Sequence, residues 1–320
     1  MLKKLARSIV STRQYEQLSI LKNRLRSTLL SPQDPSGFTE QLVTCFGQPE
    51  WRYTFLKSLP NSLKLAIKPE IEIVSKLDYE KREILLSIDS EIEYGIRVNS
   101  CKKEPETVNW IETLIHKGEV LYDIGANVGT YSLVAAKFWQ HDIEIYAFEP
   151  SFVNFAQLCK NVVLNRCSDC LYPLQIGLSD RTGIEIFNYQ NLKAGGALSA
   201  LGEPIDWKGD EFQPVFTQHL LSYKIDDLVS QLNLPIPNHL KIDVDGIELA
   251  ILHGASRTLE HESVRSLLIE IEEGDREATE IVEFLRSKGF GIQSKHRYVH
   301  GGENSPFANV YNYIFWRGDT

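Results

Sequence analysis

The sequence lacks the features that would place the chain in a membrane or outside the cell. No apolar run approaches the roughly 18 residues of a membrane-spanning helix. The basic start has neither the apolar core nor the small-residue cleavage site of a secretory signal. The five cysteines are odd in number and have no repeating spacing, and free thiols suit a reducing compartment. We therefore predict no membrane span and a cytoplasmic location.

One cysteine pair does stand at a short spacing. Cys167 and Cys170 form a C-x-x-C sequence near the end of an expected helix. Neither a second pair nor a histidine pair at zinc-finger spacing accompanies it. We interpret the pair as two ordinary, semi-buried thiols.

An excess of positive charge is also missing. With 34 Lys and Arg against 43 Asp and Glu the net charge is -9, so no nucleic-acid partner is expected, because phosphate binding needs clustered basic side chains. Residues 1–30 differ, with seven basic residues, one acidic residue and leucines at helical spacing. We interpret them as helices that pack on the domain or on a second subunit, which would make a homo-oligomer. A basic amphipathic contact with a membrane surface or with a partner is the alternative.

Two common nucleotide-binding motifs are absent. The sequence has neither the G-x-G-x-x-G of dinucleotide-binding proteins nor the G-x-x-x-x-G-K-[ST] of P-loops. It has instead the stretch 120–133, where an apolar run ends at Asp123, the chain bends through Gly125 and Gly129, and a helix should follow. Glycine lets a backbone approach a ligand closely, and a helix start presents unpaired N–H groups to negative charge. This stretch predicts a polar, nucleotide-like ligand.

Strands and helices alternate from about residue 105 onward. Strands are expected at 120–122, 143–148, 171–176, 240–244, 266–271, 291–294 and 310–316, and helices at 105–115, 130–139, 151–165, 247–259 and 277–287. This order predicts an α/β fold in which helices cover both faces of a parallel sheet. Such sheets bind ligands beyond the carboxyl ends of their strands, where the strand order reverses.

Loop signals divide the rest of the chain. Residues 1–35 are predicted to be a basic helical segment that ends in a loop containing two prolines. Residues 36–105 are predicted to be an accessory α+β region, and residues 106–320 the main domain. Strands of the accessory region are expected at 71–74, 84–88 and 93–98. Within the main domain, residues 187–221 are expected to be a long loop, which we interpret as a substrate loop or lid.

Two acids narrow the choice of ligand. Asp123 stands two positions before the first glycine, and Glu149 ends the next strand, 26 residues later. Acceptors at neighbouring strand ends suit a ligand with an ammonium group and a ribose diol, as S-adenosylmethionine has. Asp123 would meet its amino-acid portion and Glu149 its ribose hydroxyls. The glycine bend, with Asn127 and Thr130, would hold the carboxylate.

These stretches resemble a known family, the FkbM-type S-adenosylmethionine-dependent methyltransferases. The resemblance rests on motifs at 123–132, 148–155, 177–180, 241–248 and 268–271. They occur in the family's order and together span about half of the chain. Asp245 departs from the pattern, since glutamate is common there, and Ser151 stands near a position that is often proline. Neither change removes a carboxylate or a glycine.

The resemblance implies a Rossmann-like class I methyltransferase sheet of seven strands. Residues 1–100 lie outside the resemblance, and the part of the chain before the main domain is expected from its own pattern to be a helical and small α+β extension. It also implies O-methylation of a hydroxyl on a carbohydrate or natural product, so the partner would be a small-molecule or glycan acceptor. By position, Leu178 and Ser179 would lie near the adenine. A nicotinamide-dependent oxidoreductase is a less favoured alternative, as is a non-catalytic assembly module that keeps the fold.

A hydroxyl acceptor must lose a proton, which calls for a general base or a metal ion. The candidate catalytic residues are Lys241, Asp243 and Asp245, with Asp243 at the carboxyl end of its strand. Lys241 would steer an anionic acceptor or simply pair with an acid. Asp243 with Glu270 and Glu272 would offer oxygen ligands to Mg²⁺, although a solvated acidic strand end gives the same pattern.

Overall fold

The computed structural model describes residues 60–205, 209–274, 276–297 and 308–318. The chain divides into two compact units, Met1–Ile71 and Glu72–Thr320. The described part of the first unit is helix α5 (Asn61–Ile67), followed by the 3₁₀ helix η1 (Lys68–Ile71). The predicted basic helical segment, and the oligomer contact assigned to it, lie outside the described residues. No helix in the described ranges is both long and apolar enough to cross a membrane.

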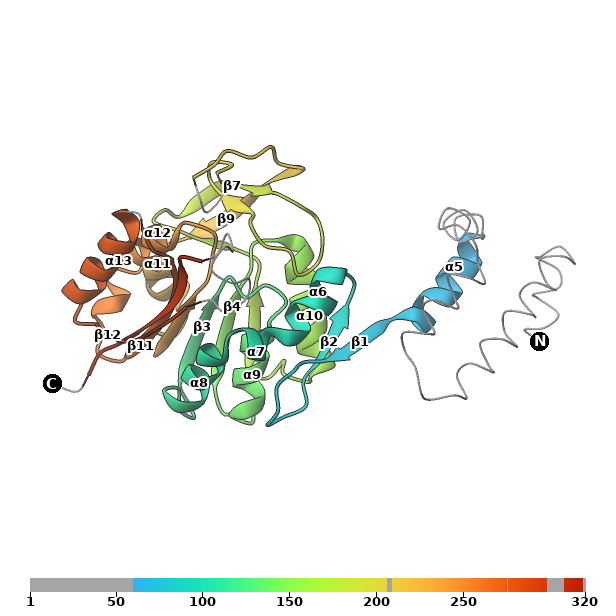
Figure 1. Cartoon of the computed structure of the whole chain (residues 1–320), viewed down its shortest axis with the longest axis horizontal. Coiled ribbons are helices and arrows are strands. Elements are labelled where there is room, and N and C mark those ends of the chain that lie inside the picture. The colour runs from blue at the N-terminus through green and yellow to red at the C-terminus, as the bar shows by residue number, and fades with distance from the viewer. Residues whose placement is uncertain (1–59, 206–208, 275, 298–307, 319–320) are drawn as a thin grey trace, which may run out of the picture. The chain divides into compact units, whose positions relative to one another are not determined.

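The second unit is built on a seven-stranded sheet (Figure 1). Its strands in spatial order are β12 (Gly291–Arg297), β13 (Val310–Trp316), β11 (Ser266–Glu272), β10 (His239–Ile242), β3 (Val120–Ile124), β4 (Glu144–Phe148) and β5 (Leu171–Leu174). β13 runs antiparallel to both of its neighbours, and every other neighbouring pair is parallel. The predicted Rossmann-like sheet is therefore confirmed.

Helices cover both faces of this sheet, as predicted (Figure 1). One face packs on α8 (Pro105–Thr113), α9 (Thr130–Phe138) and α10 (Phe152–Leu164); the other packs on α11 (Ile225–Gln231), α12 (Glu248–Gly254), the 3₁₀ helix η3 (Thr258–Glu260) and α13 (Arg276–Ser287). Successive residues of a strand point to opposite faces. Leu121 thus belongs to the first apolar cluster and Tyr122 to the second, and both are almost fully buried.

The strand order reverses at β3, which lies between β4 and β10. α9 leads from β3 to β4 on the first face, whereas α12 leads from β10 to β11 on the second face. Because these crossovers diverge, the carboxyl ends of β3 and β10 border a crevice, as expected at a switch point. The cavity described below opens there.

A short segment precedes the sheet in the chain. β1 (Ile73–Lys76) and β2 (Leu85–Ile88) form an antiparallel hairpin near the predicted positions. After them come α6 (Glu91–Gly95), the 3₁₀ helix η2 (Arg97–Asn99) and α7 (Ser100–Lys103). The strand predicted at 93–98 is therefore wrong.

A helix-start signal explains this error. Ser90 Oγ accepts a hydrogen bond from the Glu93 N–H at 3.1 Å, and Glu93 Oε2 accepts one from the Asp89 N–H at 2.6 Å. This Ser-x-x-Glu pattern is of the capping-box type. Gln157 Nε2 also donates to Glu93 Oε1 at 2.8 Å, and Glu93 is buried. These contacts fix the helix, although the alternating apolar residues that follow favour a strand.

The region predicted as a loop at 187–221 is partly strand. A second sheet has the order β6 (Gly177–Leu178), β9 (Phe216–Tyr223), β7 (Gly183–Tyr189) and β8 (Ala200–Leu201). The loop prediction is wrong at 187–189, which belong to β7, at 200–201, which form β8, and at 216–221, which belong to β9. In β9 three consecutive polar residues, 217–219, conceal the period of a strand. Residues 190–199, between β7 and β8, remain a loop.

Candidate functional site

The bend after β3 is built around two glycines in the left-handed conformation. Gly125 has φ +78°, and a Cβ atom there would lie 1.9 Å from the Asp243 carbonyl oxygen. Gly129 has φ +85°, caps the start of α9, and would meet Leu158 Cδ1 at 2.5 Å. Only glycine allows this close packing of backbone against β10 and α10. The strand, bend and helix predicted from 120–133 are all present.

A buried ion-pair network lies directly beneath the bend. Lys241 Nζ stands 2.6 Å from Asp243 Oδ2 and 3.8 Å from Asp123 Oδ1. Burial alone would lower the pKa of Lys241, but the carboxylates of Asp243 and Asp123 raise it above its ordinary value. Burial would likewise raise the pKa of Asp243, yet Lys241 holds it below its ordinary value. Ser132 Oγ donates to Asp123 Oδ2 at 2.5 Å, so Asp123 ties β3 to both α9 and β10.

Glu149 closes the other side of the bend. Its Oε2 accepts a hydrogen bond from the Asn127 N–H at 2.8 Å, and its Oε1 accepts one from the Ser151 N–H at 2.9 Å. Burial raises the pKa of Glu149 to about 7, against the opposing effect of these two N–H groups. Each oxygen keeps lone-pair capacity for a further donor, such as a ribose hydroxyl.

A cavity of about 400 Å³ opens above these residues. Of the predicted site residues, its lining includes Gly125, Asn127, Glu149, Leu178, Asp243, Asp245 and Glu270. The others are absent from the lining: Asp123, Gly129, Thr130, Ser179, Lys241 and Glu272. Lys241 and Asp123 are thus buried behind the residues that line the cavity. Asn127 Oδ1 is buried without a hydrogen-bond partner, so a donor group is missing here, and an amino-acid or nucleoside ligand would supply one.

A loop covers the cavity. We call residues 194–199 the roof loop. Arg97 Nε and Nη2 both donate to the Gly195 carbonyl, at 2.9 and 2.8 Å. Asn127 Nδ2 donates to the Gly196 carbonyl at 2.9 Å. The glycine bend and the 3₁₀ helix η2 therefore hold the roof loop from two sides.

Sequence reasoning missed Arg97, Lys103 and Asn154, which also line the cavity. Asn154 accepts a hydrogen bond from the Gly195 N–H at 2.9 Å and donates to the Gly196 carbonyl at 3.0 Å. Asn154 lies within the 148–155 motif of the family resemblance, and this position could have indicated that it is near the site. Arg97 falls in the strand wrongly predicted at 93–98, and Lys103 lies in α7, for which the sequence predicted no helix.

This arrangement can be compared with known proteins. The family model described as methyltransferase FkbM domain matches residues 123–292. The chain belongs to this family. The predicted S-adenosylmethionine-dependent methyltransferase is thereby confirmed, and the glycine bend, the buried Glu149 and the unpartnered Asn127 oxygen fit that cofactor.

Relatives of this FkbM-family chain include two proteins named as methyltransferases. It is 27% identical over 181 residues to the hexuronic acid methyltransferase AglP of Haloferax volcanii, covering 56% of this chain and 66% of that one. It is 24% identical over 209 residues to the 31-O-demethyl-FK506 methyltransferase FkbM of Streptomyces tacrolimicus, covering 59% and 78%. Among solved structures, precorrin-6y C5,15-methyltransferase of Geobacter metallireducens superposes with a TM-score of 0.42 and 15% identity, covering 67% of this chain and 87% of that one.

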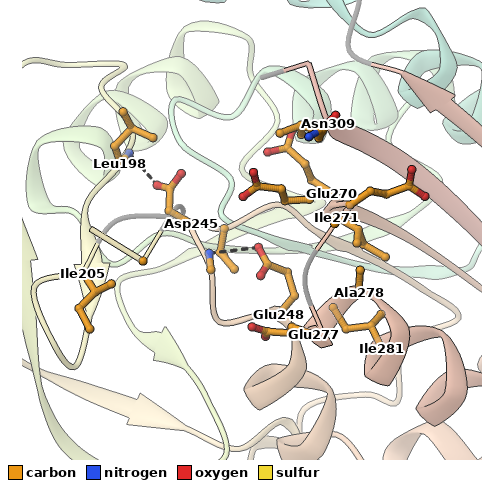
Figure 2. A pocket seen from close by; sticks show the side chains of 17 residues that line it. Leu198, Ile205, Asp245, Glu248, Glu270, Ile271, Glu277, Ala278, Ile281 and Asn309 are labelled. Atoms are coloured by element: carbon orange, nitrogen blue, oxygen red, sulfur yellow. Dashed lines mark hydrogen bonds between the residues drawn. The ribbon is translucent and has the colours of Figure 1, made fainter. Parts of the chain in front are cut away.

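A second pocket, of about 570 Å³, adjoins the cavity of about 400 Å³ in which we expect this FkbM-family methyltransferase to bind its cofactor, here called the cofactor cavity. Figure 2 shows residues that line the second pocket. Both pockets are lined by Leu198, Val244, Asp245, Glu270 and Val310. We call the second pocket the acidic pocket because six carboxyl groups line it, those of Asp245, Glu248, Glu270, Glu272, Glu273 and Glu277. The described residues of its lining include no Lys, Arg or His. The predicted residue Glu272 thus belongs to this pocket.

The carboxyl groups of the acidic pocket have unusual pKa values. Burial raises the pKa of Asp245 to about 6, although the Leu198 N–H, 2.7 Å from its Oδ2, opposes this (Figure 2). Burial also raises the pKa of Glu248 to about 8. Burial, with the charges of Asp243 and Glu104, raises the pKa of Glu270 well above its ordinary value. Shifted carboxyl groups beside a cofactor cavity are typical of proton-transfer sites.

The Mg²⁺ site predicted at Asp243, Glu270 and Glu272 gains no support. Asp243 is paired with Lys241. Across the described ranges, the group of closely spaced donor atoms suited to a metal ion contains none of these three residues.

Proposed function

We propose that this methyltransferase transfers its methyl group to a hydroxyl oxygen of an uncharged, polyhydroxylated acceptor, such as a sugar or a sugar-like natural product. The acidic pocket carries this proposal, since it meets the cofactor cavity at Asp245 and Glu270. Hydroxyl groups donate hydrogen bonds to carboxylates. AglP is named as a hexuronic acid methyltransferase and FkbM of Streptomyces tacrolimicus as a 31-O-demethyl-FK506 methyltransferase, and both names point to the same broad class of hydroxylated acceptors.

The charge of the pocket bears on which acceptor fits. A uronate would bring a carboxylate next to Asp245, whose pKa of about 6 leaves it ionised near neutral pH, and like charges at short range repel. A neutral hydroxylated ring meets no such penalty. We therefore infer a neutral acceptor, in contrast to the hexuronic acid in the name of AglP.

Asp245 is our candidate for the general base. S-Adenosylmethionine, when bound, supplies an electrophilic methyl group on a sulfonium. The acceptor oxygen becomes a good nucleophile as its proton passes to a neighbouring carboxylate. Asp245 stands between the two pockets, and its pKa of about 6 leaves it ionised yet basic near neutral pH. Asp243 is instead held by Lys241, which suits a role in shaping the bend.

The insert between β7 and β9 would supply acceptor contacts. Leu198 of the roof loop and Ile205, beyond β8, both line the acidic pocket (Figure 2). Both come from the region 187–221 that the sequence predicts as a substrate loop. Because both residues line the acidic pocket, we expect substitutions in this insert to change which acceptors the enzyme methylates.

The acceptor class is tested with S-adenosylmethionine labelled in its methyl group. Candidate acceptors are neutral hexosides, the matching hexuronosides and macrocyclic natural-product alcohols, and labelled products are identified by mass spectrometry. We expect O-methylated neutral acceptors and little product from the hexuronosides. A preference for the hexuronosides, or label found only on nitrogen, would contradict the proposal.

Asp245→Asn tests the base. We expect kcat to fall by about 100-fold or more, with the affinity for S-adenosylhomocysteine nearly unchanged. In the wild type, kcat should rise with pH up to about 6 and then level off, because only the ionised carboxylate accepts a proton. The control is Asp142→Asn, an exposed carboxylate that lines neither pocket. Full turnover in Asp245→Asn would remove Asp245 from the chemical step.

A further inference from the structure

A cluster of side chains with possible metal-ligand atoms lies at the amino ends of β4 and β5, at the opposite end of the main sheet's strands from the cofactor cavity. His141 stands in the turn between α9 and β4, and Cys167, Asp169 and Cys170 form the turn between α10 and β5. Both turns lead into the amino ends of their strands, whereas the cofactor cavity opens at the carboxyl ends. We propose that this cluster binds a zinc ion. The proposal is independent of the methyl acceptor and of the catalytic base.

Donor atoms of the four side chains lie near one another, with His141 close to each of the other three. His141 Nδ1 lies 2.8 and 3.0 Å from the two carboxylate oxygens of Asp169. His141 Nε2 lies 4.0 Å from Cys167 Sγ. One donor atom each of His141, Asp169 and Cys170 lie within 4.8 Å of one another. In a tetrahedral zinc site the ligand atoms are about 3.3–3.8 Å apart, so small side-chain adjustments close the site.

The kinds of atoms favour zinc over harder cations. Thiolate and imidazole are ligands that zinc takes in proteins, and two cysteines with one histidine and a water form a known zinc set, whereas Mg²⁺ and Ca²⁺ prefer oxygen. Cys167, Cys170 and His141 Nε2 would be the protein ligands. Asp169 would hold the His141 Nδ1–H, as carboxylates commonly do for zinc-bound histidines. The fourth position would take a water, because the side chains of His141 and Asp169 are 27% and 64% exposed.

The two thiols find only weak partners without an ion. Cys167 Sγ lies 3.5 Å from the Asn165 carbonyl oxygen, and Cys170 Sγ lies 3.6 Å from the Cys167 carbonyl oxygen. Both cysteines are buried. A backbone hydrogen bond already joins β4 to the α10–β5 turn, since the Ile145 N–H donates to the Cys170 carbonyl at 2.8 Å. An ion here would cross-link the α9–β4 turn to the α10–β5 turn and so brace the two helices that flank the cofactor bend.

Cobalt substitution tests the site in the full chain. The reduced, metal-free protein is titrated anaerobically with Co²⁺, and thiolate-to-cobalt charge-transfer absorption is recorded; Zn²⁺ then displaces the cobalt to give its affinity. We expect the absorption to saturate at one cobalt per chain and to vanish on zinc addition. Zinc should also raise the Tm.

Variants identify the ligands. Cys170→Ser should abolish the charge-transfer absorption, and Asp169→Asn should keep it but weaken zinc binding by about 10–100-fold. Cys159→Ser, on α10 outside the cluster, should match the wild type. The proposal is overturned if the wild type shows no thiolate absorption, or if Cys170→Ser binds zinc as tightly as the wild type. A Cys167–Cys170 disulfide that re-forms in the presence of zinc would also overturn it, because the pair would then be a redox pair.

Discussion

Replacing Gly125 with alanine is expected to destroy the cofactor site. A Cβ atom there would overlap the Asp243 carbonyl oxygen at 1.9 Å, so the backbone of β3 or β10 must move. A non-glycine residue at φ +78° costs ~1–2 kcal/mol, and the overlap adds ~1–3 kcal/mol. We expect affinity for S-adenosylhomocysteine to fall by about 100-fold or more, since each 1.4 kcal/mol is about tenfold. Calorimetric titration measures the affinity, and urea unfolding measures the stability.

Gly118 offers a matched control. It has φ +76°, and nothing lies within 4 Å of the position that a Cβ atom would take there. Gly118→Ala therefore carries the conformational cost of ~1–2 kcal/mol without the overlap, and should bind S-adenosylhomocysteine as the wild type does. Equal effects of the two substitutions on binding would show that the close approach to Asp243 is unimportant.

The second large effect is expected from Lys241→Met. This substitution leaves Asp123 and Asp243 without their shared counterion. The site is buried, since the side chains of Lys241 and Asp123 are each only 2% exposed. Removing one partner of a buried ion pair costs ~3–5 kcal/mol, so the free energy of unfolding at pH 7 should fall by about that amount. Denaturant unfolding measures it.

The pH dependence distinguishes this cause from a packing defect. In the wild type Lys241 depresses the pKa of Asp243, so this stabilisation exists above the ordinary aspartate pKa and is lost as the pH falls through the depressed value. In Lys241→Met the carboxyl groups can protonate, and the difference from the wild type should shrink toward pH ~4. A difference that is constant with pH would argue for a packing defect instead. Lys81→Met, which breaks an exposed pair with Glu112, should cost less than ~1 kcal/mol.

The sequence predicted those parts of the site that depend on local pattern. The apolar strand, the glycine bend and the helix of 120–133 are contiguous, so their geometry follows from periodicity and glycine alone. Glu149 could be placed because it ends the next strand of an alternating α/β chain. Parallel strands bring such ends to one edge of a sheet.

The missed parts depend on contacts between distant segments. Arg97 reaches Gly195 across 98 residues, and no local pattern indicates that pairing. His141 and Cys167 are 26 residues apart, so the C-x-x-C looked unaccompanied until the fold joined the two turns. The acidic pocket likewise gathers Asp245, Glu248 and the end of β11 from separate segments.

Calorimetric titration with S-adenosylhomocysteine and, separately, with NAD⁺ is the measurement that tests the cofactor site most directly. We expect saturable binding of S-adenosylhomocysteine at one site per chain, no binding of NAD⁺, and an affinity about 100-fold weaker in Glu149→Gln, which loses the charge that strengthens the ribose hydrogen bonds. An absence of S-adenosylhomocysteine binding, tighter binding of NAD⁺, or an unchanged affinity in Glu149→Gln would contradict the assignment of this cavity.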